Sequence, residues 1–479
     1  MVTAGREKKL ALELKSAWEK MSGREKKEAM GLGEEYKEFL GRAKTEREAV
    51  TEIVEVARKK GFVDLTERTG GEGRRRRRLR AGEKFFWIFR QKCLALVIVG
   101  EEPLEKGVNL IGAHLDAPRL DLKPCPLYEE QGLALFKTHY YGGIKKYQWL
   151  TVPLALHGRV IKSDGSVLDL TIGEKEGEPV FVITDLLPHL AKDQMDKKMR
   201  EAIPGENLNI LVGNMPAEDP EGKEKVKKAV LEYLYQEYGM VEEDFVSAEI
   251  EAVPAGNPKD VGFDRSMIGG YGQDDRICTF AALKALLAVA EENPARTAVA
   301  LFVDKEEIGS TGSTGARSSF LENFLAELIA LAEGSYDGLL LKRTLANTRA
   351  ISADVNAAFD PTYPEVMDKL NAPRLGYGAV VTKYTGAGGK YSTSDADAEY
   401  MGFIRNLFNE KGVVWQTGEL GKVDQGGGGT IAQFLARYTM QVVDIGVPLL
   451  SMHSPFEVAS KADLYMAWKG YRAFFLTRG

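Results

Sequence analysis

The sequence has few cysteines for its length. Three occur in 479 residues, at Cys93, Cys125 and Cys278. They are too few and too scattered for the disulfide framework of a small secreted protein, and the pattern is typical of a reducing compartment. Cys93 and Cys278 fall in apolar segments, so we expect them to be small core residues.

Long hydrophobic runs are also missing. No apolar stretch approaches the ~20 residues that a helix needs to cross a bilayer. The N-terminal stretch is charged and helical in pattern, which does not fit a signal peptide. The formal net charge of −6 is mild and does not suggest a nucleic-acid binder. We therefore expect a cytoplasmic protein that binds neither membranes nor nucleic acid.

One run of like charge stands apart from this mild balance. Arg74–Arg78 is a block of five arginines. We interpret it as a solvated loop between two strands, since blocks of like charge usually stay exposed. A local contact with an anion or a partner is the alternative.

The chain has the ordinary apolar content of a globular protein, 44%, and is long enough for two domains. Residues 6–60 predict helices, with a break at Gly31–Gly33. Strands that alternate with helices predict an α/β fold, with a mixed, mostly parallel central sheet flanked by helices. Strands are expected at 85–90, 94–99, 108–113, 297–303, 349–353, 378–381 and 441–445, and helices at 278–290, 394–410 and 430–437.

The texture of the sequence changes from about residue 121. Turn-rich stretches carry strand candidates at 159–161, 180–183 and 208–212, and a charged helix is expected at 223–237. This segment separates candidate site residues on either side of it. We therefore predict that residues 1–120 and 266–479 form one discontinuous catalytic domain, and that residues 121–265 form a β-rich domain inserted into it.

Histidine is scarce, with five residues, yet two histidines end apolar runs. His114 lies in LIGAHLDAP and His453 in PLLSMHSP. Carboxylates lie at the ends of other elements between them, and in an open α/β sheet sites form outside the carboxyl ends of the strands. Such carboxylates and imidazoles are what a hydrolytic metal site requires. The carboxylates are Asp274, Asp275, Asp304, Glu306, Glu307 and Asp354.

Spacing suggests how these residues could divide the work. In an extended segment Asp116 points to the same side as His114 and could orient its imidazole. Glu306 and Glu307 are adjacent and point to different places, so one can bind metal while the other acts as general base. Asp274 suits a carboxylate shared between two cations. Taken singly, each residue also fits a duller role, such as a solvated helix start or a helix cap.

The order of these motifs resembles that of the aspartyl aminopeptidase family of cocatalytic zinc exopeptidases. The resemblance extends over nearly the whole chain. The resemblance is carried by His-x-Asp, Asp-Asp and the stretches GAHLDAPRLDLKP, DKEEIGSTGSTGA, ISADVNAAFDP and LLSMHSPFEVASKADL. It implies a metal-dependent aminopeptidase that acts on peptides with a free N-terminus. It also implies an inserted dimerisation domain and a tetrahedral homododecamer whose active sites face an internal cavity.

The resemblance also assigns roles to single residues. Two divalent ions per subunit are implied, zinc above all, with cobalt or manganese as options. Asp274 would bridge them, and Glu306 would be the catalytic base. Asp116 would support the first histidine. The implied metal ligands are His114 and Asp354 for one ion, Glu307 and His453 for the other, and Asp274 for both.

The chain departs from the family pattern in three places. Tyr147–Pro153 lacks the histidine and the charges that the family carries there. Asp275 occupies a position where eukaryotic members look to have Asn. Gln425–Gly429 replaces a more polar stretch. These departures bear on residue preference. Lys383 matches a substrate-pocket lysine that could pair with an acidic side chain, although Lys145, Lys146 or Lys390 could serve equally well.

Several functions stay open beside an acidic-residue aminopeptidase. A neutral- or basic-residue aminopeptidase, a carboxypeptidase and a deacylase would use the same kind of centre. A non-enzymatic alternative is a shell-forming or cargo-binding protein that keeps the metal site for stability. A requirement for a free α-amine would distinguish an aminopeptidase of any residue preference from a carboxypeptidase or a deacylase.

Overall fold

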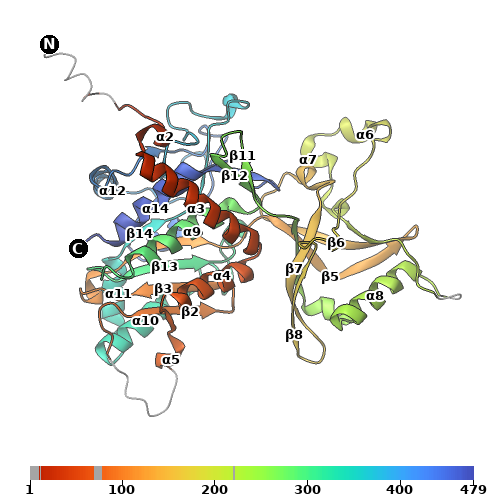
Figure 1. Ribbon diagram of the computed structural model, residues 1–479, viewed down its shortest axis with the longest axis horizontal. Coiled ribbons are helices and arrows are strands. Elements are labelled where there is room, and N and C mark those ends of the chain that lie inside the picture. Colours follow the sequence, from red (N-terminus) through yellow and green to blue (C-terminus); the bar gives the residue numbers. More distant parts are fainter. Residues whose placement is uncertain (1–9, 11, 70–77, 219–221, 479) are drawn as a thin grey trace.

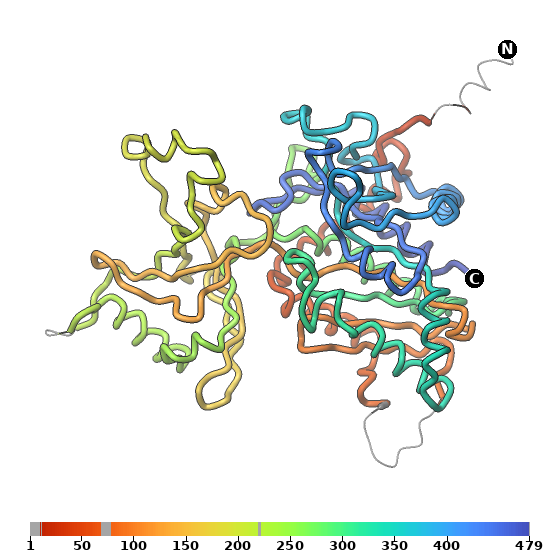
Figure 2. The backbone as a smooth tube through the Cα atoms, turned by 180° about the vertical axis from the view of Figure 1, so that it is seen from behind, coloured from red at the N-terminus to blue at the C-terminus, as the bar shows by residue number. Residues whose placement is uncertain are grey.

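Two lobes make up the computed structural model, which describes residues 10, 12–69, 78–218 and 222–478 (Figures 1 and 2). The larger lobe combines the beginning and the end of the chain. The smaller lobe, Arg119–Pro254, is formed by one continuous middle segment. Residues 74–77 of the arginine run lie outside the described residues. No helix in the described ranges is long and apolar enough to cross a bilayer.

A nine-stranded sheet forms the centre of the larger lobe. Its order is β1-β2-β3-β13-β4-β14-β18-β16-β17, and five of its eight neighbouring pairs are parallel. The predicted mixed, mostly parallel sheet is confirmed. Its strands are Val63–Asp64 (β1), Lys84–Phe89 (β2), Cys93–Ile98 (β3), Asn109–His114 (β4), Ala298–Val303 (β13), Arg349–Ser352 (β14), Ala379–Thr382 (β16), Trp415–Thr417 (β17) and Gln441–Gly446 (β18).

Helices cover both faces of this sheet, which explains why its strands read as unbroken apolar runs. In β3, Leu94 and Leu96 join one core, whereas Ala95 and Val97 join the core on the opposite face. The two cysteines of this lobe, Cys93 and Cys278, are buried as predicted. One face is covered by α3 (Gly23–Arg42), α4 (Glu46–Lys59), α9 (Gln273–Val289), α12 (Ala398–Glu410) and α14 (Lys461–Phe475), and the other by α10 (Phe320–Glu333), α11 (Gly338–Ala346) and α13 (Ala432–Ala436).

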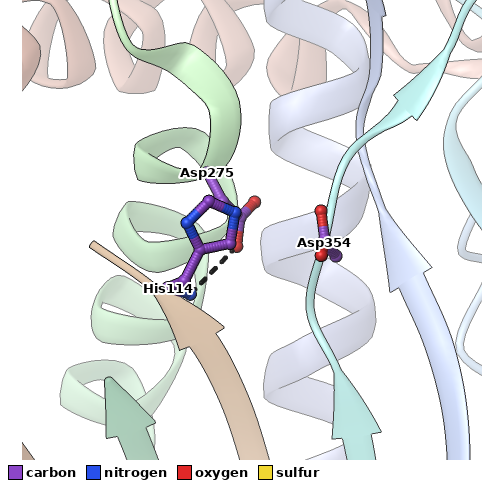
Figure 3. A group of neighbouring side chains, drawn as sticks. All are labelled: His114, Asp275 and Asp354. Carbon is purple, nitrogen blue, oxygen red and sulfur yellow. Dashed lines mark hydrogen bonds between the residues drawn. The ribbon is translucent and has the colours of Figure 1, made fainter. Parts of the chain in front are cut away.

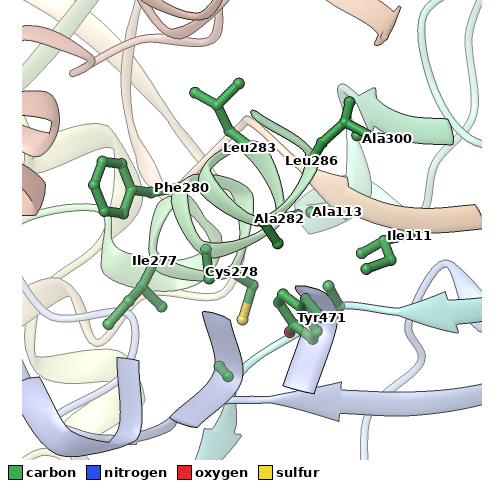
Figure 4. Packing of buried hydrophobic residues seen from close by; sticks show 14 of the residues in the cluster. Ile111, Ala113, Ile277, Cys278, Phe280, Ala282, Leu283, Leu286, Ala300 and Tyr471 are labelled. Carbon is green, nitrogen blue, oxygen red and sulfur yellow. The ribbon is translucent and has the colours of Figure 1, made fainter. Parts of the chain in front are cut away.

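Helix α9 is the central helix of the first core. It is apolar on all sides and almost wholly buried, as expected for a helix that has no solvent face. Figure 4 shows Ile277, Phe280, Leu283 and Leu286 pointing away from its axis in different directions, with Tyr471 of α14 beside it. The helix therefore gives its N-terminal residues a rigid support.

The predicted helix break at Gly31–Gly33 is wrong. Helix α3 runs through both glycines and ends at Arg42, and α4 starts after a capping box at Thr45. At Gly33 a Cβ would lie 2.6 Å from the Lys461 side chain. The glycine there allows α14 to approach closely and does not mark a turn.

The smaller lobe is built on a six-stranded sheet of order β8-β7-β10-β5-β6-β9. Helix α8 (Lys225–Tyr238) packs against it, as the charged segment at 223–237 predicted. The strand predicted at 180–183 is wrong, because Phe181 and Val182 form only isolated bridges. The strands are Arg119–Glu130 (β5), Leu133–Tyr141 (β6), Leu154–Ile161 (β7), Val167–Ile172 (β8), Ile210–Gly213 (β9) and Glu249–Pro254 (β10).

A third sheet has five strands. It joins residues 259–270, which follow the smaller lobe, to strands from later in the chain. Its order is β11-β12-β20-β19-β15. Strand β11 lies at the end of the predicted insertion and pairs with β12, which follows the insertion and pairs with β20 of the larger lobe. The division at residues 121 and 265 stays a prediction of domain organisation. The strands are Lys259–Val261 (β11), Met267–Gly270 (β12), Asn356–Ala357 (β15), Pro448–Leu450 (β19) and Glu457–Ser460 (β20).

Candidate metal centre

Polar side chains at the ends of neighbouring strands meet at one edge of the large sheet. Strand β4 lies between β13 and β14, and all three run parallel. His114 ends β4, Glu306 and Glu307 follow β13, and Asp354 follows β14. Parallel strands bring their carboxyl ends to the same edge, so three predicted site segments come together here.

The third sheet brings in the remaining two segments. Strand β12 leads into α9, whose first residues include Asp274, and β19 leads into the turn that carries His453. Both strands pair with β20. The peptide bond between Asp274 and Asp275 is cis. The structure thus brings together all five residues predicted as metal ligands.

Asp274 faces two imidazoles with its two oxygens. Its Oδ1 lies 3.1 Å from Nε2 of His114, and its Oδ2 lies 3.2 Å from Nε2 of His453. Burial opposes the charged form of Asp274, but the hydrogen bonds with both histidines outweigh burial and lower its pKa. A carboxylate placed between two nitrogen ligands is suited to being shared by two cations.

His114 is buried and held from both sides of its ring. Its Nδ1 lies 3.0 Å from the Asp116 carbonyl oxygen and 3.3 Å from Asp116 Oδ1. Burial favours the neutral imidazole, but hydrogen bonds with Asp116 and Asp274 outweigh it, so the pKa of His114 is raised. Asp116 therefore contacts the Nδ1 side of the ring, where a carboxylate can orient a metal-binding imidazole, and this role stays a prediction.

Two groups of three among the described residues could each hold a metal ion. One consists of His114, Asp274 and Glu307, and the other of His114, Asp275 and Asp354, with the ligand atoms of each group within 4.8 Å of one another. Figure 3 shows this second group, with Asp275 beside His114 and Asp354 facing them from a neighbouring part of the chain. Asp275, which fitted a helix cap on sequence grounds, also accepts a hydrogen bond from the His114 backbone N–H at 3.4 Å.

The charges of the centre fit bound cations. Burial raises the pKa of Asp275, Glu307 and Asp354 well above the ordinary carboxyl value. Oδ1 of Asp275 and Oε1 of Glu307 are buried without a hydrogen-bond partner among the described residues. Buried carboxylate oxygens normally have partners, and a divalent cation would both satisfy these atoms and allow the three groups to ionise.

Glu306 lies beside the candidate ligands and differs from them in its setting. Burial raises its pKa to about 7. Its backbone N–H donates to Oδ1 of Asp116, and that of Glu307 donates to Oδ2, each at 3.1 Å. Asp116 thus fixes the backbone of both glutamates as well as the His114 ring.

A cleft of about 460 Å³ opens onto the centre. Glu306, Asp354 and His453 line it, and neutral side chains make up much of the rest of the lining. The glycine-rich run forms one wall, where Gly428 donates a backbone hydrogen bond to Thr385. The other lining residues are Asp274, Glu307, Gly309, Ser310, Val355, Asn356, Ser392, Leu420, Gly427, Gly429, Thr430, Gln433, Phe434 and Met452.

The lysines considered for substrate binding lie elsewhere. Lys383 does not line this cleft; its side chain is 46% exposed and pairs with Asp395 at 3.7 Å. Lys390 pairs with the same carboxylate at 2.9 Å. Lys146 donates to the Arg200 carbonyl oxygen in the smaller lobe. A role for Lys383 in substrate binding stays a prediction.

Glu457 is a site residue that the sequence did not reveal as one. It is buried on β20 and accepts hydrogen bonds from the backbone N–H groups of Gln273 (2.6 Å), Asp274 (3.2 Å) and His453 (2.7 Å). Burial raises its pKa to about 8. A glutamate inside the otherwise neutral strand EVAS was the available signal, but its partners are far away in the chain.

Comparison with known proteins finds relatives that match nearly the whole chain. Residues 39–475 match the family described as aminopeptidase I zinc metalloprotease (M18). A probable M18 family aminopeptidase 1 from Clostridium acetobutylicum is 49% identical over 466 residues, which cover 97% of this chain and 98% of the relative. The crystal structure of an M18 aminopeptidase from Thermotoga maritima is 48% identical, covers 97% of this chain and 99% of its own, and superposes with a TM-score of 0.91. The mApe1 dodecamer of S. cerevisiae, 23% identical with a TM-score of 0.72 and coverage of 92% and 95%, shares the fold.

Proposed function

The chain belongs to the M18 family of aminopeptidase I zinc metalloproteases and is a metalloaminopeptidase, and we propose that it removes N-terminal residues from peptides with two divalent ions. The observation that carries the proposal is the Asp274 carboxylate, whose two oxygens each face a different imidazole. Such a carboxylate can serve two ions at once. Zinc is the expected metal, with cobalt or manganese as substitutes.

Each ion would take its remaining ligands from one side of Asp274. His114 and Asp354 would hold one ion, and His453 and Glu307 the other. Asp275 lies close enough to join His114 and Asp354. When bound, such ions polarise the scissile carbonyl and lower the pKa of water.

Glu306 is the general base in this proposal. It takes a proton from the attacking water and passes that proton to the departing amine. Its pKa of about 7 in the cleft suits a group that must both accept and release a proton near neutral pH. Asp116 keeps Glu306 in place through its backbone N–H.

Two neighbouring substitutions test the division of roles between the glutamates. Glu306→Gln should retain zinc but lower kcat about 10²- to 10⁴-fold, the usual contribution of a general base. Glu307→Ala should lose zinc, measured by elemental analysis after dialysis. Glu55→Gln, on the exposed face of α4, is the matched control. A Glu306→Gln enzyme with normal kcat and full zinc would rule out this role.

The cleft favours neutral N-terminal residues over acidic ones. Among the described residues that line it, none is a lysine or an arginine, whereas Leu420, Phe434 and Met452 are apolar. An acidic side chain would lose hydration there without gaining a lysine or arginine as a partner. We therefore place a neutral-residue preference ahead of the acidic preference that Lys383 suggests.

A panel of aminoacyl chromogenic substrates tests both the amine requirement and the residue preference. With the zinc enzyme, kcat/KM for leucyl and methionyl substrates should exceed that for the aspartyl substrate at least about tenfold. The N-acetylated versions should not be cleaved. Faster cleavage of the aspartyl substrate, lost in Lys383→Ala, would instead support the acidic preference. Cleavage of blocked substrates would favour a deacylase or carboxypeptidase, and inactivity with zinc, cobalt and manganese would favour the shell-forming alternative.

Assembly into a tetrahedral homododecamer is part of the proposal. The mApe1 relative forms a dodecamer, and the smaller lobe of this chain exposes large apolar side chains, as expected of a surface that meets another subunit. A cytoplasmic location stays a prediction based on cysteine usage. Among the described residues of the smaller lobe, the large apolar residues that are more than half exposed are Val167, Val180, Leu186, Leu190, Met195, Met199, Met215, Tyr235 and Val246.

A further inference from the structure

The smaller lobe reaches the metal centre through Tyr141, the last residue of its strand β6, and the two glycines that follow it. The Tyr141 hydroxyl donates to Oδ2 of Asp116 at 2.8 Å. The Gly143 carbonyl oxygen lies 2.8 Å from Nδ1 of His453. Between them, a Cβ on Gly142 would lie 3.3 Å from Oε2 of Glu307. One short segment therefore contacts three different groups of the centre.

Tyr141 is held rigidly in the lobe from which it comes. It pairs with Arg119 in the β5–β6 register, and the Arg119 guanidinium lies 4.0 Å from the centre of the Tyr141 ring. Arg119 is itself buried and pairs with Asp121 (2.8 Å), Glu251 (3.1 Å) and Glu46 of α4 (3.4 Å). This network spans both lobes, so the position of the phenol is fixed relative to the larger lobe.

Asp116 depends on that phenol. Its Oδ1 accepts the Glu306 N–H and lies near His114, whereas Oδ2 accepts the Glu307 N–H and the Tyr141 hydroxyl. Without the hydroxyl, one oxygen of a fully buried carboxylate would keep a single donor. A buried carboxylate that loses a donor reorients or attracts another group, and Asp116 is the residue that orients both His114 and the glutamate backbone.

The Gly143 carbonyl acts on the second histidine in a comparable way. A carbonyl oxygen can only accept a hydrogen bond, so Nδ1 of His453 must carry the proton in this contact. In the neutral ring, Nε2 then keeps its lone pair, and Nε2 is the atom that faces Asp274 and Glu307. The carbonyl thereby selects the tautomer that can ligate a metal.

We propose that the Tyr141–Gly143 segment of the smaller lobe positions the metal centre, with Tyr141 as a positioning residue that acts on the ligands and on Glu306 through Asp116. This inference rests on the proposed function for the identity of the ligands. It gives the smaller lobe a role within its own subunit, separate from any role in assembly.

Tyr141→Phe in the full-length protein tests the role of the hydroxyl, because it removes one oxygen and keeps the ring against Arg119. Loss of such a supporting contact typically costs 10- to 100-fold in metal affinity or activity. We expect kcat to fall by about that factor with KM nearly unchanged, and zinc to transfer to a chelator at about tenfold lower chelator concentration. The visible absorption bands of the cobalt-loaded protein should shift. Tyr140→Phe, on the exposed neighbouring residue of the same strand, should change none of these.

A glycine pair tests the segment in a second place. Gly142 and Gly165 both have left-handed backbones, with φ of +74° and +82°, and both lie in the smaller lobe. An alanine at Gly142 would press on Glu307, whereas no atom lies within 4 Å of the Cβ position at Gly165. Gly142→Ala should therefore weaken zinc retention more than Gly165→Ala, although both carry the same backbone strain.

The cobalt spectrum and the chelator titration decide the inference independently of catalysis. An unchanged spectrum together with unchanged zinc transfer in Tyr141→Phe would overturn it, even if activity fell. If Glu306→Gln proved fully active, the proposed role of Glu306 would fail, but a shifted cobalt spectrum in Tyr141→Phe would still support positioning of the ligands.

Discussion

At the scale of single residues, the centre is organised by buried carboxylates in different states. Hydrogen bonds with two histidines lower the pKa of Asp274, whereas burial raises the pKa of Glu307 and Asp354. Each shift has a local cause that no stretch of sequence contains. In the proposed function, a bound cation would be the partner that these carboxyl groups share.

Gly446 is a small residue on which the position of Asp354 depends. A Cβ there would overlap the Asp354 carbonyl, so Gly446→Ala should push the Asp354 backbone away from the centre. We expect the variant to lose about 1–3 kcal/mol of stability, the usual cost of overpacking, and to release zinc to a chelator sooner than the parent.

The control for this prediction is another glycine-to-alanine substitution, which should change the stability in the opposite direction. Gly402 lies within α12 with no atom within 4 Å of its Cβ position. Alanine in a helix interior is more favourable than glycine by about 0.5–1 kcal/mol, so Gly402→Ala should raise the melting temperature. Equal stability and equal zinc release for both variants would contradict the prediction.

At the scale of elements, the sequence predicted best what is decided locally. The apolar strands at 94–99 and 297–303 lie within one residue of β3 and β13, because a strand buried on both faces is apolar throughout. Polar residues at strand ends were enough to locate the centre. The helix break at Gly31–Gly33 was wrong because a glycine looks the same in a turn and in a close helix contact.

Contacts that join distant elements were beyond reach of the sequence. Glu457 and Tyr141 meet their partners only after the third sheet and the smaller lobe have folded. Neither lies in a spacing that indicates a site. Supporting contacts of this kind depend on how elements pack against one another, and local periodicity does not show that packing.

His157 on β7 joins α4 to the smaller lobe through hydrogen bonds whose strength we expect to depend on pH. Its Nδ1 lies 2.7 Å from Glu48 and its Nε2 lies 3.0 Å from Glu174, which also pairs with the buried Lys44. Burial opposes its charge, but the hydrogen bonds with Glu174 and Glu48 outweigh burial and raise its pKa. The stabilisation is therefore complete below the ordinary histidine value of 6.5 and is lost as pH rises through the raised pKa.

We expect His157→Gln to destabilise the protein by about 2 kcal/mol at pH near 6, the usual value of hydrogen bonds to charged groups. The difference in melting temperature from the parent should shrink as the pH rises through the raised pKa of His157. His189→Gln, on an exposed turn of the same lobe, provides the comparison. A His157→Gln difference that is constant with pH would show that the charged form contributes nothing.

At the scale of the whole molecule, the proposed dodecamer gives a simple expectation. Light scattering after size exclusion should report about twelve times the 52.8 kDa of one chain. Leu190→Asp combined with Met199→Asp, both on the exposed face of the smaller lobe, should reduce the mass. Leu370→Asp, also on an exposed residue but in the larger lobe, should leave it unchanged. A monomeric parent protein would contradict the assembly.

In the large sheet, strand β4 is synthesised long before the two strands that it pairs with. Strand β4 has only β13 and β14 as neighbours, and both are translated after the whole smaller lobe. At about 5–20 residues per second, the ribosome needs roughly ten to forty seconds to reach β13 after completing β4. During that time an apolar strand has two open edges, which are templates for pairing with other chains. Slower translation would therefore lengthen the time during which β4 can pair with other chains.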